Sequence, residues 1–343
     1  MSHKQIEIYQ GEIWRQSGCL DFENTFVRMV QQLLTVAGYT ATNHGMIWQK
    51  HDRRVYLAVV DDVVRFDSAP GQSALDCMTP RDLLITDGWI SKPVSAKICQ
   101  LPRSWYGIYS YQPAPVDHMP QRRYGLCVNR LDAERLAVFC ELARVSNLDQ
   151  DAYVNFNCQA HDRDLSDQEK QQRFCDVFYA SSNIVQSELD PVFLSLQHQV
   201  PYCNHDLTVE QVHAASLVNL VMETYYQDSS IAFSEKIFRA LVTARPWVVY
   251  AGKWAVARLR QLGFDVLDDL VNHHDYDEAN SRELKYRVMV AAARQAADKV
   301  TQDPAVLARC QAAAEHNQQL LAQYRSQLAK DMGTWFQDFA QKL

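Results

Sequence analysis

Apolar positions three or four residues apart predict an amphipathic helix from Asp21 to Ala37, and Gly38 follows it as a stop signal. Two short apolar runs come next, Val55–Val60 and Leu83–Thr86, and each is followed directly by aspartate. Short runs of this kind are typical of buried parallel strands whose carboxyl ends open into loops. The first part of the chain therefore predicts an α/β arrangement.

The same alternation continues more clearly after residue 120. Apolar runs predict strands at 124–128, 153–157, 217–221 and 247–250, and helical periodicity is found at 132–144, 167–178, 209–215, 235–243 and 254–262. Strands that alternate with helices predict a parallel sheet. The last segment, 304–343, is helical in composition and predicts a long helix broken only at Gly333.

Proline density marks a change of domain. Four prolines lie between Leu101 and Gln121, and they disfavour both helix and central strand. At 343 residues the chain is long enough for about two domains. We therefore predict an N-terminal domain over 1–120, a C-terminal domain over 121–303 and a helical segment over 304–343 that packs back on the first domain.

Composition narrows the class of protein. Apolar residues make up 47% and charged residues 22%, as in ordinary soluble globular proteins, and the net charge of −7 supplies no broad cationic face for nucleic acid. Nine dispersed cysteines without paired spacing indicate reduced thiols and no zinc site. The chain shows neither a signal-peptide pattern nor an apolar run near 18 residues, so we expect a cytoplasmic protein without membrane insertion.

A candidate site follows the predicted strand that ends at Glu223-Thr224. Ten residues after Thr224, the segment Ser234-Glu235-Lys236 begins a helix on which Arg239 also lies. Ser234 is a suitable N-cap, which an ordinary amphipathic helix would explain equally well. Ligands of parallel α/β sheets bind at the carboxyl edge, however, where carboxylates can hold ribose hydroxyls and cations can hold phosphate.

Further motifs follow in a fixed order: Arg245-Pro246 before an apolar strand, Gly263-Phe264 after a helix, and Tyr276-Asp277. This order, over about residues 122–295, resembles a family of glycosyltransferase-like proteins, many of them phage-encoded. The Ser-Glu-Lys helix start is similar to the donor motif of fucosyltransferases. The resemblance implies two Rossmann-like domains facing across a cleft, the GT-B arrangement. One departure is Asn272-His273-His274, where relatives usually carry an acidic pair, and it puts an acidic role there in doubt.

The resemblance also implies a donor-binding set in the C-terminal domain: Arg130, Arg135, Glu223, Ser234, Glu235, Lys236, Arg239, Tyr276 and Asp277. Its cations can stabilise a departing diphosphate without a metal. Adjacent His273 and His274 point in different directions and have no third ligand at metal-binding spacing, so we predict no metal. The general base is expected from the N-terminal domain, with Asp61 and Asp62 first and Asp67 and His44 behind them.

These expectations predict a metal-independent, inverting glycosyltransferase that takes UDP- or GDP-sugar as donor and holds no tightly bound cofactor. The acceptor is a hydroxymethylated base of phage DNA, a glycan or a protein, and a phage-encoded enzyme would act in the host cytoplasm. A DNA acceptor predicts a basic groove drawing on Arg53, Arg54, Arg122 and Arg123. The alternative is a catalytically silent protein of the same fold that binds sugar nucleotides or glycans.

Overall fold

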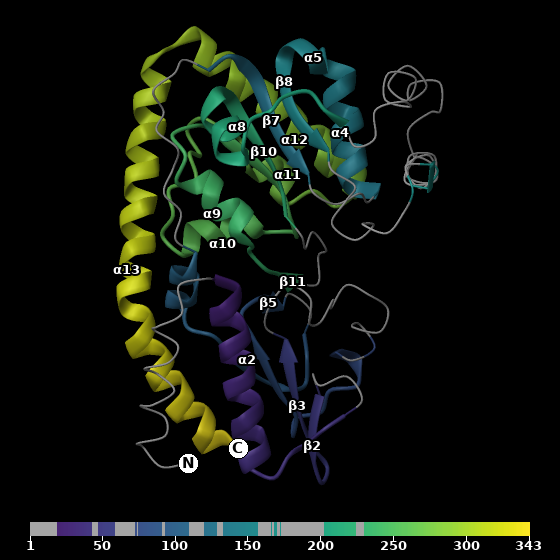
Figure 1. Ribbon diagram of the computed structural model, residues 1–343, viewed down its shortest axis with the longest axis vertical. Coiled ribbons are helices and arrows are strands. Elements are labelled where there is room, and N and C mark those ends of the chain that lie inside the picture. The colour runs from purple at the N-terminus through teal and green to yellow at the C-terminus, as the bar shows by residue number, and fades with distance from the viewer. Residues whose placement is uncertain are drawn as a thin grey trace. The chain divides into compact units, whose positions relative to one another are not determined.

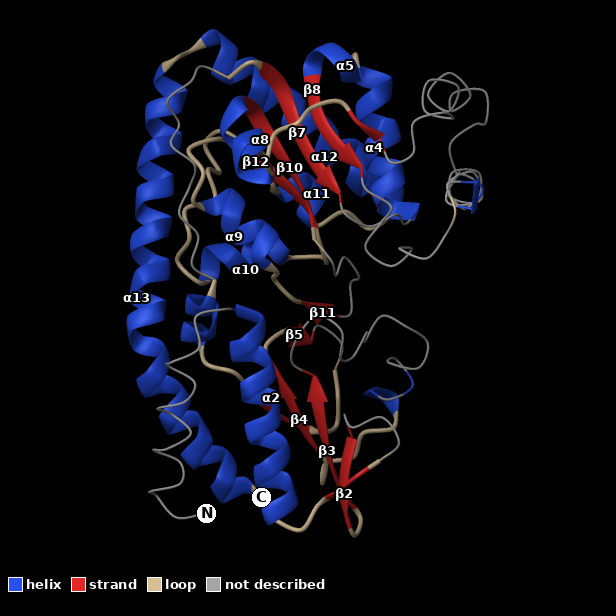
Figure 2. Cartoon of the chain, viewed as in Figure 1, coloured by secondary structure: helices blue, strands red, loops and turns tan. Residues whose placement is uncertain are grey.

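The computed structural model forms two compact units, shown in Figures 1 and 2. Unit 1 comprises 1–110, 224–234 and 319–343, and unit 2 comprises 111–223 and 235–318. The residues that the structure describes are 19–42, 47–58, 73, 75–90, 93–109, 120–128, 133–156, 166, 168–169, 172, 202–223 and 230–343.

Unit 1 is built on a five-stranded sheet in the order β1-β2-β3-β4-β6. Its strands are β1 (Thr40–Ala41), β2 (Ile47–Lys50), β3 (Arg53–Ala58), β4 (Leu83–Thr86) and β6 (Lys97–Gln100). The pairs β3-β4 and β4-β6 are parallel, whereas β1-β2 and β2-β3 are antiparallel. A separate antiparallel pair joins β5 (Trp89–Ile90) to β11 (Ser230–Ile231). Residues 55–58 of the predicted strand at 55–60 and the predicted strand at 83–86 thus belong to one sheet of mixed strand direction. The last two residues of the first prediction, 59 and 60, lie outside the described residues.

The core of unit 1 combines both ends of the sequence. Helix α2 (Cys19–Val36) buries the predicted stripe that includes Phe26 and Val30, and the last part of α13 (Ala305–Lys342) joins the same core through Leu328, Met332 and Phe336. The ring of Phe26 lies 5.0 Å from Trp105 and 5.6 Å from Phe336, measured between centroids. Residues 319–343 of the C-terminal helix are therefore an integral part of unit 1.

The described start of the proline-rich segment, residues 101–109, contains regular structure that the sequence does not predict. Residues 103–108 form a 3-10 helix, η1 (Arg103–Ile108), in which Trp105 and Tyr106 are buried. Pro102 directly precedes η1, where the missing N–H removes no bond from the helix. A Cβ on Gly107 would lie 2.4 Å from the backbone nitrogen of Arg325 on α13. The close packing of η1 against α13 therefore requires glycine at position 107. The boundary of unit 1 accordingly falls after Ser110.

Unit 2 contains a five-stranded sheet in the order β12-β10-β7-β8-β9. Its strands are β7 (Arg122–Val128), β8 (Ala152–Phe156), β9 (Tyr202–Cys203), β10 (Ser216–Met222) and β12 (Trp247–Tyr250). The pairs β7-β8, β7-β10 and β10-β12 are parallel, and only β9 is antiparallel. The chain proceeds from β7 to one side and later returns to the other side, so the strand order reverses between β7 and β10. Such a reversal is the usual ligand-binding position of an open parallel sheet.

Helices lie on both faces of this sheet, as Figure 2 shows. The helices described in unit 2 are α4 (Ala133–Val145), α5 (Leu148–Asp151), α8 (Val209–Ala215), α9 (Glu235–Leu241), α10 (Ala255–Gln261), α11 (His274–Asp277), α12 (Arg282–Gln302) and the first part of α13. Gly263 has a φ of +95° and follows Leu262, the C-cap residue of α10, which confirms the predicted stop. Parallel strands alternating with helices confirm the predicted α/β class.

One expectation about helices is wrong, because α13 continues through Gly333 without a break. The long helix α12 was not predicted at all. A single glycine costs a helix only about 1 kcal/mol relative to alanine. The neighbouring Met332, Trp335 and Phe336 are buried in the unit 1 core, which outweighs that cost.

Candidate functional site

The carboxyl edge of the unit 2 sheet gathers buried charged residues at the point where the strand order reverses. Glu223 follows β10 and is fully buried, and its backbone N–H donates to the carbonyl of Tyr250 over 3.0 Å. Arg135, in the first turn of α4, is also buried and donates to the carbonyl of Glu223 over 3.1 Å. The hydrogen bond spans the reversal, because α4 follows β7 and Glu223 follows β10. The structure thus brings these two predicted residues together.

Lys285 lies at the same edge and was not predicted. It is in the first turn of α12 and only 4% exposed, and its Nζ lies 5.7 Å from the ring centroid of Tyr250, the last residue of β12. A signal did exist, since Lys285 lies four residues before Met289 and eight before Ala293, on the apolar stripe of the helix. A lysine at such a position is buried only when something compensates its charge.

The first turns of α4 and α12 are joined at this edge by an ion pair. Glu134 and Arg282 approach to 2.5 Å, and the side chain of Glu134 is only 14% exposed. Both helices therefore present their first turns, with Arg135 and Lys285, to the same end of the sheet.

The predicted helix start at Ser234-Glu235-Lys236 lies at the passage from unit 1 to unit 2. Ser234 is buried at the end of the unit 1 segment, and Glu235 begins α9 in unit 2. Glu235 and Lys236 form an ion pair of 3.5 Å with partly exposed side chains. Because α9 is only 7 residues long, its side chains rather than its dipole must provide any attraction for an anion.

Arg239 lies in the last turn of α9 and pairs with a different helix. Its Nε is 3.1 Å from a carboxylate oxygen of Glu210 on α8. Nearby, burial and the charge of Arg239 lower the pKa of His213 to about 4. This ion pair of Arg239 thus joins α9 to α8.

Tyr276 and Asp277 are both buried and bound within unit 2. The Asp277 carboxylate accepts hydrogen bonds from the N–H groups of Val256 and Ala257, over 3.1 and 3.0 Å, and so caps the start of α10. Burial raises the pKa of Asp277, while these backbone hydrogen bonds and the charge of Lys285 oppose that rise. The carboxylate thus satisfies two backbone N–H groups at the start of α10 from within unit 2.

Tyr276 belongs to a chain of hydrogen bonds that includes His273. The backbone N–H of Val249 donates to the Tyr276 hydroxyl over 3.3 Å, and that hydroxyl lies 2.5 Å from Nδ1 of His273. On the other side of the ring, Nε2 of His273 lies 2.6 Å from the carbonyl of Val266 and donates to it. Burial lowers the pKa of His273 to about 4, so the ring is neutral at pH 7. His273 therefore serves the fold of unit 2.

Several predicted residues lie outside the described part of the chain. These are the proposed bases and the first donor-domain arginine: His44, Asp61, Asp62, Asp67 and Arg130.

The four arginines expected to form a basic groove are each engaged within their own unit. Arg53 donates to the carbonyl of Lys342 over 2.5 Å, and Arg54 pairs with the buried Asp82 at 2.9 Å, both in unit 1. In unit 2, Arg122 donates to the carbonyl of Ala152 and lies over the ring of Tyr153, while Arg123 pairs with Asp298. All four begin their strands, β3 and β7, at the amino edge of each sheet. The structure thus gives a basic DNA groove built on these arginines no support.

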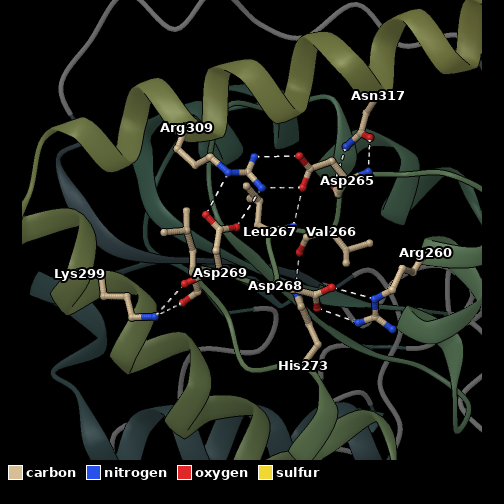
Figure 3. A network of polar contacts seen from close by, with 11 residues as sticks. Arg260, Asp265, Val266, Leu267, Asp268, Asp269, His273, Lys299, Arg309 and Asn317 are labelled. Carbon is tan, nitrogen blue, oxygen red and sulfur yellow. Dashed lines mark hydrogen bonds and ion pairs between the residues drawn. The ribbon is translucent and has the colours of Figure 1, made fainter.

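The amino edge of unit 2 carries a second group of charges, which Figure 3 shows. Arg309 pairs with Asp265 and Asp269 at 2.8 and 2.9 Å, and Arg260 pairs with Asp268 at 2.7 Å. Asn317 adds three hydrogen bonds, to the carbonyls of Leu241 and Asp265 and from the N–H of Asp265. These contacts fix the loop after α10 against α13, so we assign this acidic loop to stability.

Within the described residues, no group of three or more His, Cys, Asp or Glu side chains is placed to hold a metal ion. The helices in that part of the chain include none with the length and apolar character needed to cross a membrane.

Comparisons with known proteins assign this chain to no family. No protein-family model matches the chain, and no curated protein matches it. Among solved structures, the chain is similar to an alpha,alpha-trehalose-phosphate synthase (UDP-forming) from Burkholderia vietnamiensis, with 13% sequence identity and a TM-score of 0.36. The match covers 80% of this chain and 63% of that one, so this chain spans less than two thirds of its length. A likeness at this level carries no argument about the reaction.

Proposed function

We propose that this protein is a glycosyltransferase that binds a nucleotide-sugar donor at the carboxyl edge of unit 2. One observation carries the proposal: Arg135, Glu223 and Lys285 are buried together at the reversal of a parallel sheet. Burying a charge is costly unless a partner or ligand offsets the cost. A site that binds an anionic nucleotide and its ribose has a use for such charges, whereas a purely structural edge can be closed with apolar residues.

Each side chain suits one part of a nucleotide sugar. Arg135 and Lys285 supply positive charge for the diphosphate, together with Lys236 at the start of α9. The carboxylate of Glu223 suits the ribose hydroxyls. In this proposal the cations stabilise the departing diphosphate without a metal ion. Arg130, Ser234 and Glu235 remain proposed donor contacts, and Arg239, Tyr276 and Asp277 hold the surrounding helices in place.

The acceptor half of the reaction rests on the family resemblance. A GT-B enzyme of this kind takes its base from the N-terminal domain, for which Asp61 and Asp62 are proposed, and it transfers with inversion. The donor is a UDP- or GDP-sugar, and the acceptor hydroxyl belongs to a glycan, a protein or a hydroxymethylated DNA base. Because the four arginines of the predicted basic groove are engaged elsewhere, a glycan is the acceptor class we favour.

The variant Lys236→Ala tests the donor site. Its side chain is 25% exposed and its ion-pair partner is the adjacent Glu235, so the fold should tolerate the change. We expect affinity for UDP or GDP, measured by isothermal titration calorimetry, to fall about tenfold, as when one charge-assisted phosphate contact is lost. The matched control is Lys299→Ala, which removes an exposed lysine at the amino edge and should leave affinity unchanged.

Incubation with a panel of UDP- and GDP-sugars then distinguishes a transferase from a protein that only binds sugar nucleotides. Release of free nucleotide, even as slow hydrolysis, is expected of a transferase without its acceptor. Binding and thermal stabilisation without any release would favour the silent sugar-nucleotide-binding protein. Absence of nucleotide binding in the unaltered protein would overturn both.

A further inference from the structure

Trp254 combines exposure with an unusual backbone conformation at the carboxyl edge of unit 2. It follows β12 and directly precedes α10, and 43% of it is exposed, although Ala255 and Val256 beside it are buried. Its φ and ψ are +64° and +18°, in the left-handed region that bulky residues rarely adopt. The fold therefore holds a large aromatic ring in solvent at a conformational cost that glycine would avoid.

The backbone on both sides of this ring is fixed. The N–H of Trp254 donates to the carbonyl of Asp277 over 3.1 Å, and the carbonyl of Trp254 accepts from the N–H of Arg258 over 2.9 Å. Asp277 itself is buried and caps the same helix start through its carboxylate. These bonds involve main-chain atoms, so they position the indole without using it.

The indole is also oriented by its neighbour. Nζ of Lys253 lies 4.8 Å from the centroid of the Trp254 ring, and the same ammonium donates to the side chain of Asn280 over 2.8 Å. A cation over an aromatic ring is attracted by its electron-rich face. Lys253, held by Asn280, thus orients an exposed ring beside Asp277, the residue whose pKa burial raises and the charge of Lys285 lowers.

From this arrangement we propose that Trp254 is the stacking platform for the nucleobase of a bound nucleotide. The inference rests on the proposed function, because it takes the phosphates and ribose to bind at Arg135, Glu223 and Lys285. Every nucleobase has an aromatic face, and stacking on a protein ring is tolerant of base identity. A preordered ring also loses little conformational freedom when the base binds. The structural strain at Trp254 is then explained by ligand binding.

Titrations of uridine diphosphate and inorganic pyrophosphate against Trp254→Leu and Trp254→Phe test the platform. Trp254→Leu should weaken uridine diphosphate about tenfold or more, which corresponds to losing one base–aromatic stack, and leave pyrophosphate unchanged. Trp254→Phe should keep most of the affinity. Leu284→Ala is the matched control, since Leu284 is a similarly exposed apolar residue in the first turn of α12, and it should have no effect.

Trp254→Gly separates binding from packing. Glycine adopts the left-handed conformation without strain, so we expect the melting temperature to stay the same or rise by about 2 °C while nucleotide affinity falls as in Trp254→Leu. A clear drop in melting temperature would show that the indole is needed for the fold and would overturn the platform.

The remaining outcomes are equally decisive. If the unaltered protein binds uridine diphosphate and Trp254→Leu binds it equally well, the platform is overturned and the proposed function survives. If Trp254→Leu and Trp254→Gly lose affinity for free sugars but not for uridine diphosphate, the ring binds a sugar and the inference is also wrong. If the unaltered protein binds neither nucleotide nor pyrophosphate, the proposed function fails as well.

Discussion

The charged residues at the two edges of the unit 2 sheet differ in how far they are exposed to solvent. At the amino edge, Arg309 and Asp265 have side chains that are 34% and 30% exposed, and they meet in a bidentate pair. At the carboxyl edge, Arg135 and Lys285 are each only 4% exposed and lie in the first turns of α4 and α12.

Under the proposed function, the amino edge serves stability and the carboxyl edge serves a ligand. Partly exposed charges in direct ion pairs lose little hydration and can hold a loop in place. Deeply buried charges reduce stability unless a ligand or partner offsets their desolvation cost. Natural proteins accept such local costs at functional sites. We therefore expect changes at the amino edge to alter stability without altering nucleotide affinity.

The largest expected effect comes from Asn317→Leu. The side chain of Asn317 is buried and makes hydrogen bonds of 2.9, 2.9 and 2.8 Å to backbone groups of Leu241 and Asp265, all of which would lose their partner. Buried backbone groups left unsatisfied cost about 1–3 kcal/mol each, so we expect the free energy of unfolding in urea to fall by about 3 kcal/mol or more.

The adjacent residue provides a control for this variant. Gln318 makes only a 3.5 Å contact to the carbonyl of Val242, and Gln318→Ala should cost less than about 0.5 kcal/mol. If Asn317→Leu lost affinity for uridine diphosphate under conditions in which it is folded, the expectation that the amino edge affects stability alone would be wrong.

A second effect is a dependence of stability on pH through His273. Its pKa is about 4 in the folded protein, below the ordinary 6.5, because burial disfavours the charged ring. The unfolded chain therefore takes up a proton first as the pH falls, and folding loses free energy through this group below pH 6.5. The loss should reach about 1 kcal/mol between pH 6.5 and 5.5 and continue towards pH 4.

The variant His273→Phe isolates this contribution. It should be less stable than the unaltered protein at pH 7, because the carbonyl of Val266 and the hydroxyl of Tyr276 lose a partner. The two free energies of unfolding, measured in urea at several pH values, should then converge as the pH falls. Parallel curves would show that His273 is not the titrating group.

The smallest expected effect is that of Arg260→Ala. Arg260 and Asp268 form a pair at 2.7 Å with side chains that are 46% and 50% exposed, and pairs in this setting contribute less than about 1 kcal/mol. The loss should shrink further in high salt, because exposed charges are screened. A thermal melt at low and at high salt measures both. A loss as large as that of Asn317→Leu would mean that the whole acidic loop acts as one unit.

Sequence patterns predicted the elements whose signals are local. The helix at 209–215 and the strand at 247–250 were placed at their observed ends, and the stripe of Phe26, Val30, Leu33 and Leu34 is buried as expected. Helix α12 was not predicted because four of its nine buried residues are alanine: Ala292, Ala293, Ala296 and Ala297. Alanine supplies little hydrophobic contrast along a sequence.

The candidate site was predicted in part and for a different reason. Glu223 and Arg135 were reached through a family resemblance, and the strand order that joins them depends on pairing between distant segments. Lys285 was missed because a lysine in the first turn of a helix is ordinarily solvated, and its burial follows from the packing of α12 against the sheet. Tyr276-Asp277 was recognised as a motif, but its capping of α10 appears only in three dimensions.

The shared helix α13 has a consequence for synthesis on the ribosome. Unit 1 takes its core partly from residues 19–58 and partly from Leu328, Met332, Phe336 and Phe339, which leave the ribosome only after all of unit 2. Domains usually fold as they emerge, starting from the N-terminus. Here the apolar face of α2 stays uncovered until residues 319–343 have emerged. Unit 2 is therefore expected to fold first, and unit 1 is expected to need protection from aggregation until that segment is available.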